Sequence, residues 1–187
     1  MNKSVTTQEE ILEVCKQFIK EDGVKAVTIR SVASRCQLSV GSIYNYFPSK
    51  EALVTAAVQA VWIEIIHLSG RPQRPMNFKE TVTWLVDGIK QGRQRYPEFF
   101  DYQSMGFISS GSVEEDTIMT AFFKRIYQSL YQALIQDPQI DQTVFDANFT
   151  QQGFVEFIFQ ACMDSILRSA FEESYIFSII DKLLYRY

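Results

Sequence analysis

TIRSVASRCQLSVGSIYNYFPSK, residues 28–50, is the stretch that decides the fold, and it predicts two short helices joined by a tight turn. In the first helix, apolar residues recur three and four positions apart, as on one face of a helix: Ile29, Val32, Ala33 and Cys36. Thr28 precedes this face and Ser39 opens the second helix, where each hydroxyl can accept from an unpaired backbone N–H. Pro48 ends the second helix, because the residue before a proline is disfavoured in helical geometry.

The second helix, expected over residues 40–47, has an unusual surface for a helix that only packs against a core. Ile43 and Phe47 form its apolar stripe, and the other residues are mostly small or polar. A helix that enters the major groove of DNA needs small residues for close approach, and hydroxyls and amides that reach base edges. The pattern therefore predicts a recognition helix whose base-contacting residues are Gly41, Ser42, Tyr44 and Asn45. The simpler alternative is a solvated helix in an all-α domain.

The run T-I-R-x-V-A…L-S-V-G-S-I-Y-N-Y-F-P-S-K-E-A-L closely resembles the DNA-binding domain of TetR/AcrR-type transcriptional regulators, over residues 7–55. The resemblance implies that Tyr46 and Lys50 contact DNA phosphates. The predicted DNA-binding site also includes Thr28, Arg30 and Ser39, at or near helix N-termini, where anions are favoured. The family usually has glycine in the turn where Gln37 stands. If that position requires a positive φ, Gln37 adopts it at a cost of about 1–2 kcal/mol.

Composition and charge narrow the function classes. The chain has 187 residues, 47% of them apolar, which is enough to bury a core as one domain or as two small ones. The net charge is −4, but residues 1–50 carry +2 and residues 51–187 carry −6, so the basic surplus lies with the motif. The sequence begins without an apolar leader and has no apolar run of membrane-spanning length. A cytoplasmic protein is expected.

Helical patterns cover the remaining sequence and predict an all-α fold of about nine helices. Thr7 and Glu10 have capping-box spacing at the start of the first helix, and Gly23 ends it. A helix over residues 49–68 connects an N-terminal helix-turn-helix domain, residues 1–50, to a helical domain for effector binding and dimerisation, residues 51–187. A linker follows at 70–75, and further helices are expected over 78–95, 98–109 (irregular), 113–136, 143–170 and 173–186.

The sequence has no pattern typical of an enzyme, a cofactor site or a metal site. The single histidine, His67, has no second histidine or cysteine at ligand spacing, and no nucleotide-binding glycine pattern occurs. Cys15, Cys36 and Cys162 are dispersed without C-x-x-C spacing, which favours reduced thiols used as small core residues. We therefore expect neither catalysis, nor a cofactor, nor a bound metal.

Aromatic residues are abundant after residue 77. By the family resemblance, they surround a cavity for a small effector, and the scarcity of charges among them predicts a neutral or lipophilic ligand. The expected effector-binding residues are Trp84, Phe100, Met105, Phe123, Tyr127, Phe154 and Phe157. The alternative is that these side chains only fill a helical core.

The two C-terminal helices are more apolar than one subunit is expected to cover, and they resemble the four-helix dimer interface of the family. The expected interface residues are Ile158, Ile166, Ile176, Ile180 and Leu183. A two-fold dimer reads a palindromic double-stranded operator with half-sites about 34–36 Å apart. The sequence thus predicts a homodimeric DNA-binding regulator, a repressor that a small effector releases. Control by a protein partner or without ligand, and a helical binding protein or enzyme that no longer reads DNA, remain alternatives.

Overall fold

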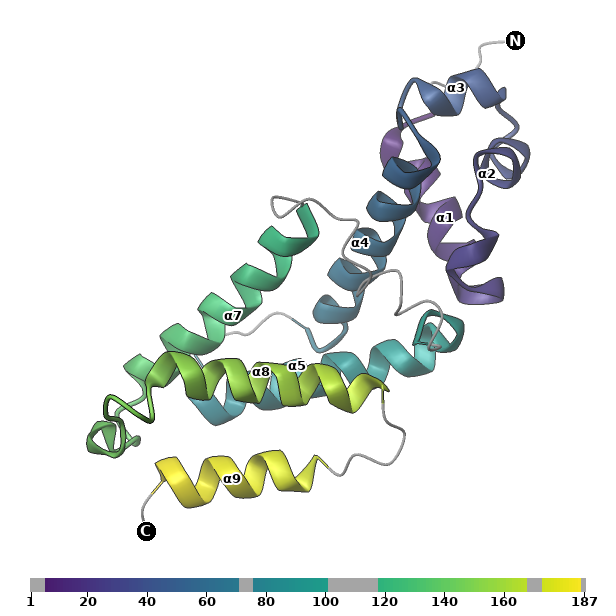
Figure 1. Ribbon diagram of the computed structural model, residues 1–187. Helices are drawn as coiled ribbons and strands as arrows, with labels where there is room; N and C mark the ends of the chain where they lie inside the picture. The colour runs from purple at the N-terminus through teal and green to yellow at the C-terminus, as the bar shows by residue number, and fades with distance from the viewer. Residues whose placement is uncertain (1–5, 71–75, 101–117, 168–172, 186–187) are drawn as a thin grey trace. The chain divides into compact units, whose positions relative to one another are not determined.

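The computed structural model describes residues 6–70, 76–100, 118–167 and 173–185, and every regular element within these ranges is a helix (Figure 1). The described residues form two compact units. The first combines the chain up to Ile66 with the segment that starts at Gly92, and the second combines residues 67–91 with those from 118 onwards. The predicted all-α fold is confirmed.

The first unit begins with α1 (Gln8–Asp22), η1 (Val24–Ala26), α2 (Ile29–Arg35), α3 (Val40–Tyr44) and most of α4 (Lys50–Leu68). The predicted capping box opens α1: the Thr7 hydroxyl accepts from the Glu10 N–H, and the Glu10 carboxylate accepts from the Thr7 N–H. Gly23 ends α1 with a φ of 78°, a conformation that glycine adopts without steric cost. Both ends of α1 are therefore set by residues next to it in sequence.

The turn between α2 and α3 explains the conformation of Gln37. The Gln37 N–H donates to the Ser34 carbonyl at 3.1 Å, and the Leu38 N–H donates to the Ala33 carbonyl at 2.9 Å. These two bonds form a Schellman motif, which places the first residue after the C-cap in the left-handed region. Gln37 has a φ of 56°. The turn therefore has the positive φ at which the family usually has glycine.

Helix α3, which the sequence predicted as a recognition helix, is shorter than expected and ends at Tyr44 instead of Phe47. After Tyr44 the backbone makes a tighter turn, in which the Tyr46 N–H donates to the carbonyl of Ile43, three residues earlier, at 3.0 Å. The following Pro48 disfavours helical geometry at residue 47, so the helix ends early. The next helix, α4, begins as predicted, with the Ser49 hydroxyl accepting from the Ala52 N–H at 3.1 Å.

Helix α4 is the core helix of the first unit, and its apolar residues from Leu53 to Ile66 are largely buried. Among the described helices it is the one whose length and hydropathy would suit a membrane span. Core helices of water-soluble proteins have the same composition, and the burial of Val61, Trp62 and Ile65 accounts for its apolar character.

The end of α5 (Phe78–Arg95) and η2 (Pro97–Phe100) complete the first unit by packing on α4. A Cβ added at Gly92 would lie 2.7 Å from the Ile65 side chain, so glycine permits this close approach. The Trp62 ring meets Phe99 and Phe100 edge-to-face, with centroids 5.6 and 5.9 Å apart. Such aromatic pairs add to the stabilisation from burial alone.

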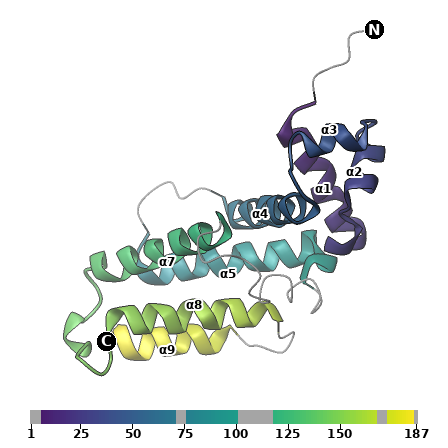
Figure 2. The same ribbon diagram turned by 45° about the horizontal axis from the view of Figure 1, so that its top comes forward.

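The second unit contains most of α5, with α7 (Ile118–Gln136), η3 (Gln142–Val144), α8 (Gln151–Leu167) and α9 (Ser174–Leu184). Helix α8 packs beside α7, and α9 runs antiparallel to α8, as both ribbon views show (Figures 1 and 2). The helix predicted over 78–95 is confirmed. Parts of three other predicted helices lie outside the described residues: 101–109, 113–117 and 168–170.

The helix predicted over 143–170 was wrong at its start, because α8 begins at Gln151. The Asp146 carboxylate accepts from the N–H groups of Asn148 and Phe149, at 2.7 and 2.8 Å. A short acidic side chain thus offers the backbone an alternative to the helix. The Phe145 and Phe149 rings stack with centroids 5.4 Å apart. The apolar residues before α8 therefore serve this local packing. Helical periodicity alone does not distinguish such a segment from a longer helix.

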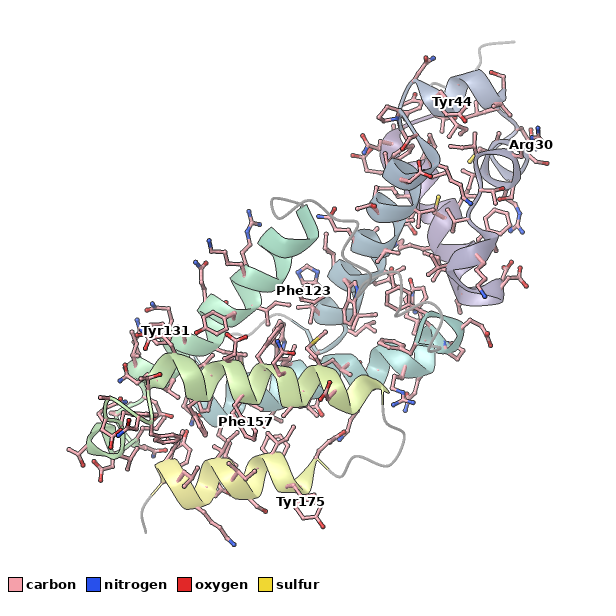
Figure 3. All side chains as sticks on the ribbon, viewed as in Figure 1. Arg30, Tyr44, Phe123, Tyr131, Phe157 and Tyr175 are labelled. Carbon is pink, nitrogen blue, oxygen red and sulfur yellow. The ribbon has the colours of Figure 1, made fainter. Side chains whose placement is uncertain are left out.

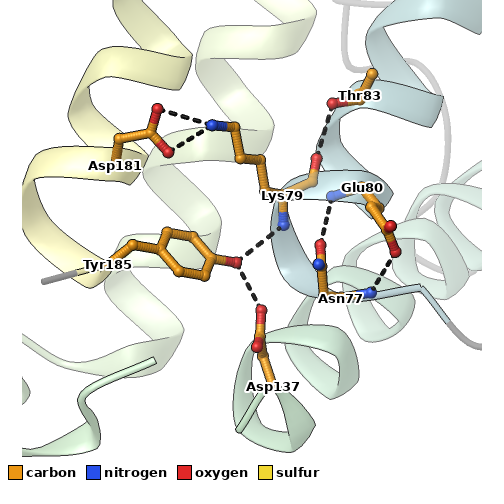
Figure 4. A network of polar contacts seen from close by, with 7 residues as sticks. All are labelled: Asn77, Lys79, Glu80, Thr83, Asp137, Asp181 and Tyr185. Atoms are coloured by element: carbon orange, nitrogen blue, oxygen red, sulfur yellow. Dashed lines mark hydrogen bonds and ion pairs between the residues drawn. The ribbon is translucent and has the colours of Figure 1, made fainter. Parts of the chain in front are cut away.

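A polar network ties α9 to the start of α5 and the end of α7 (Figure 4). Asp137 is buried and accepts from the Phe78 N–H at 3.1 Å and from the Tyr185 hydroxyl at 2.6 Å. The Lys79 ammonium pairs with Asp181 of α9 at 2.6 Å. Burial and the hydrogen bond to Asp137 raise the pKa of Tyr185, so the phenol stays protonated and donates. Three segments distant in sequence are thereby held together.

Cys15 and Cys162 are buried in the first and second units, as expected for small core residues. Burial raises the pKa of both thiols to about 12. They are therefore protonated at neutral pH and behave as apolar side chains. Cys36 is half-buried at the end of α2, and burial raises its pKa as well.

Candidate DNA-binding site

Helix α3 is anchored on one side and polar on the other. Ile43 and Phe47 are buried in the first unit, at 0% and 3% exposed, as the sequence predicted. The opposite side carries Gly41, Tyr44 and Asn45, all exposed, with Tyr44 at 48%. Figure 3 labels Tyr44 on α3 and Arg30 on α2 in this unit. Helix α3 and the turn after it thus expose small, aromatic and amide groups, while Ile43 and Phe47 hold this segment against the core.

The N-terminus of α3 is capped as predicted. The Ser39 hydroxyl accepts from the Ser42 N–H at 3.0 Å, and the two serine hydroxyls lie 2.8 Å apart. Ser42 is half-buried, so its hydroxyl serves the cap as well as the surface. The pair therefore caps the first turn of α3.

The fold does not require glycine at position 41. A Cβ added there would meet only the Ser39 hydroxyl oxygen, at the ordinary contact distance of 3.8 Å. The residue does not have a positive φ. The fold therefore has room for a side chain at the exposed front of α3.

Thr28 and Ser31 form a reciprocal cap at the start of α2. The Thr28 hydroxyl accepts from the Ser31 N–H at 3.1 Å, and the Ser31 hydroxyl accepts from the Thr28 N–H at 3.0 Å. The role of Ser31 was missed by sequence reasoning, although its position three residues after Thr28 was the available signal. Arg30 is exposed between them.

Tyr46 and Lys50 differ in their surroundings. The Tyr46 hydroxyl donates to the backbone carbonyl of Thr6, forty residues earlier, and the side chain is half-buried. Lys50 is exposed at the first position of α4. Tyr46 thus holds the entry of α1 near the end of α3, while Lys50 is available to an anion. Their phosphate contacts stay a prediction.

Comparison with known proteins supports one family. A family model described as "Bacterial regulatory proteins, tetR family" matches residues 11–57. The repressor KstR of Rhodococcus jostii is 28% identical over 120 residues, which cover 63% of this chain and 56% of that protein. KstR of Mycobacterium tuberculosis is 37% identical over 121 residues, covering 59% and 52%. The chain thus spans about half the length of these curated relatives.

The fold agrees with solved structures. A crystal structure of BioQ with its double-stranded DNA operator superposes with a TM-score of 0.61 over 96% of this chain and 98% of that one, at 11% identity. Residues 11–57 belong to the TetR family of bacterial regulatory proteins. Both KstR proteins are transcriptional repressors, in agreement with the expectation of a regulator that is not an enzyme.

The predicted effector residues do not surround one described cavity. Within the second unit, Trp84 lines an open groove of about 710 Å³ beside polar residues, and its indole N–H donates to the Gly70 carbonyl. Phe123 and Tyr127 line a groove of about 470 Å³ between α7 and α8. Phe154 and Phe157 line a third, of about 590 Å³, beside α9.

Two of the predicted effector residues belong elsewhere. Phe100 is buried in the first unit, where it packs against Trp62 and Phe99. Met105 lies outside the described residues. Aromatic content alone could not separate these environments, because a groove wall and a dense core use the same side chains.

The structure corrects three of the predicted interface residues. Ile158, Ile176 and Ile180 are 0–1% exposed within their own unit, so they have no surface left for a second subunit. The side chain of Ile166 lies outside the described part of α8. Leu183 is exposed, and Phe157 and Tyr175, both labelled in Figure 3, are exposed at 53% and 63%. The outer apolar surface of α8 and α9 is therefore formed by different residues from the buried stripe.

Proposed function

We propose that this TetR-family protein is a cytoplasmic, sequence-specific DNA-binding transcriptional repressor. The observation that carries the proposal is the surface of α3 and of the turn that follows it. Gly41, Tyr44 and Asn45 are exposed beside the buried Ile43 and Phe47, and an added Cβ at Gly41 would make only an ordinary contact. The names of its relatives and the DNA complex of BioQ support the same function.

In the proposed complex, α3 lies in the major groove with Gly41 at the closest approach. The Asn45 amide pairs with an adenine, Tyr44 contacts a thymine methyl group, and Ser42 adds a short polar contact. Phosphates are bound by Lys50 and Arg30, together with Thr28, Ser39 and Tyr46. The first set of residues recognises the DNA sequence, and the second positions the protein on the duplex.

The test is selection of binding sites from genomic and random double-stranded DNA with the purified wild-type protein. We expect one enriched palindrome. Asn45→Ala should relax the preference at one or two positions of each half-site, by about 1–3 kcal/mol each. Asn148→Ala, which removes an exposed asparagine of the second unit, is the matched control and should leave the selected motif unchanged. Failure to enrich any sequence would contradict the proposed function.

We propose that Lys50 contributes affinity without sequence preference. Lys50→Ala should weaken binding to all DNA and reduce the slope of log affinity against log salt by about one per half-site. Lys124→Ala removes an exposed lysine from α7 and serves as the control. A loss confined to one base pair, at unchanged salt slope, would assign Lys50 to base recognition instead.

The palindrome requires two recognition helices, and we propose that the protein acts as a homodimer through α8 and α9. Phe157, Tyr175, Ile179 and Leu183 supply the apolar contact surface, since Tyr175, Ile179 and Leu183 recur every fourth position along α9. A small, mostly apolar effector is proposed to bind the second unit and lower operator affinity. To act as a switch, the effector must bind the state that is released from DNA more tightly than the DNA-binding state, by about 1–3 kcal/mol.

A further inference from the structure

Glu64 stands where three segments of the first unit meet. One of its carboxylate oxygens accepts from the Lys16 ammonium of α1 at 2.6 Å. The other accepts from the Arg95 guanidinium at the end of α5. Glu64 itself belongs to α4, so a single carboxylate bridges residues 48 positions before it and 31 positions after it.

The bridge is more protected than an ordinary surface ion pair. The side chains of Lys16 and Glu64 are only 13% and 20% exposed. Burial by itself would raise the pKa of Glu64, but hydrogen bonds from Lys16, Tyr96 and Arg95 outweigh it and hold the pKa below its ordinary value. Tyr96, the third donor, is 3% exposed. The carboxylate is thus charged and fully engaged at neutral pH.

The surroundings of Glu64 keep the end of α5 in place. The neighbouring Ile65 packs against Gly92, and Trp62, one turn earlier on α4, packs against Phe99 and Phe100. Helix α1 also contacts η2 and α2. Helix α2 packs on both α1 and α3, and the Tyr46 hydroxyl, after α3, donates to the Thr6 carbonyl, before α1. A shift of α1 against α4 would therefore move α3 as well.

We propose that Glu64 is a positioning residue for DNA recognition, which locks α1 to α4 and to the end of α5 and thereby sets the orientation of the recognition helix. This inference rests on the proposed function. Glu64 touches no DNA in this role, and it acts through Lys16 and α1. A carboxylate that only stabilised the fold would affect unfolding, but it would not separate specific from non-specific DNA binding.

The first test uses amide hydrogen exchange of the free protein, and needs no DNA. Glu64→Gln keeps the shape of the side chain and removes its charge. It should speed exchange in two places, the middle of α1 around Lys16 and the segment 92–96. The control is Glu13→Gln, which removes the other carboxylate bound to Lys16, at 2.6 Å and 64% exposed, without crossing between helices. The control should affect α1 alone. Faster exchange at neither place, or at only one, in Glu64→Gln would overturn the coupling.

The second test uses the operator selected with the wild-type protein and a random duplex of equal length. Glu64→Gln should weaken operator binding about five- to tenfold, with less than a twofold change for the random duplex. Arg95→Gln should follow it, whereas Arg95→Lys, which retains a cation, and Glu13→Gln should stay near wild type. Equal losses for both duplexes, or no loss, would overturn the positioning role. If the wild-type protein bound no DNA, the proposed function would fail and the positioning role with it, while the exchange result would still decide the coupling of the helices.

Discussion

Gln37 adopts a strained, left-handed backbone conformation in the turn between α2 and α3. Its left-handed conformation follows from the Schellman bonds at the end of α2, and costs a residue with a Cβ about 1–2 kcal/mol. Glycine would avoid this cost but lose more backbone entropy on folding, about 0.5–1 kcal/mol. Gln37→Gly should therefore raise the free energy of unfolding by about 0.5–1 kcal/mol, measured in denaturant at fixed protein concentration. Gln37→Ala, which keeps the Cβ, should remain close to wild type, and an equal gain in both variants would contradict the explanation.

Substitution of Gly41 should affect the stability of the fold and the affinity for DNA differently. Because its added Cβ meets only ordinary contact, Gly41→Ala should leave the free energy of unfolding unchanged or raise it by up to about 1 kcal/mol, since alanine favours a helix. Operator affinity should fall at least tenfold, as measured by fluorescence anisotropy, because the methyl group would hold α3 away from the base pairs. Wild-type affinity in this variant would show that α3 does not approach DNA through Gly41.

At the scale of helices, the Glu64 bridge predicts a pH dependence. The folded-state pKa of Glu64 lies below its ordinary value of 4.5, so its contribution to stability is present above that pH and is lost as pH falls through the folded pKa. The free energy of unfolding of Glu64→Gln should lie about 1–3 kcal/mol below wild type above roughly pH 5. The gap should narrow at lower pH, when the wild-type carboxylate is protonated. A gap independent of pH would mean that the charge is not what stabilises the bridge.

At the scale of the whole molecule, assembly depends on the exposed apolar surface of α8 and α9. Phe157→Glu and Leu183→Glu place a charge on this surface without disturbing the buried stripe, so each should yield folded monomers by light scattering and lose tight operator binding. Ile135→Glu, at a comparably exposed position of α7, is the control and should remain dimeric. Ile180 is unsuitable for this test, because a charge at a fully buried site would unfold the subunit. A stable dimer in both variants would place the interface elsewhere.

The effector proposal is also a prediction about the whole molecule. An apolar compound that binds the α7–α8 groove should raise the melting temperature and weaken operator affinity, and DNA should weaken binding of the compound by the same factor. Phe123→Ala should remove both responses, whereas Phe149→Ala, in the groove beside α9, should retain them. A response lost only in Phe149→Ala would move the ligand to that second groove.

Sequence alone determined the features that depend on neighbouring residues. The caps at Thr7, Thr28 and Ser39 and the span of α5 were predictable, because a cap joins residues three apart and a helical face repeats every three or four positions. The family likewise followed from one continuous motif. The DNA contacts of that motif stay predictions, since they depend on a partner molecule.

Only the tertiary structure decided which distant residues meet. Helical periodicity showed that α9 is apolar, but it could not show that Ile176 and Ile180 are covered by the same subunit while Leu183 is not. Nor could it assign the Tyr46 hydroxyl to the Thr6 carbonyl, or Glu64 to both Lys16 and Arg95. These contacts join residues tens of positions apart, and their partners are selected by how the helices pack, which no local pattern encodes.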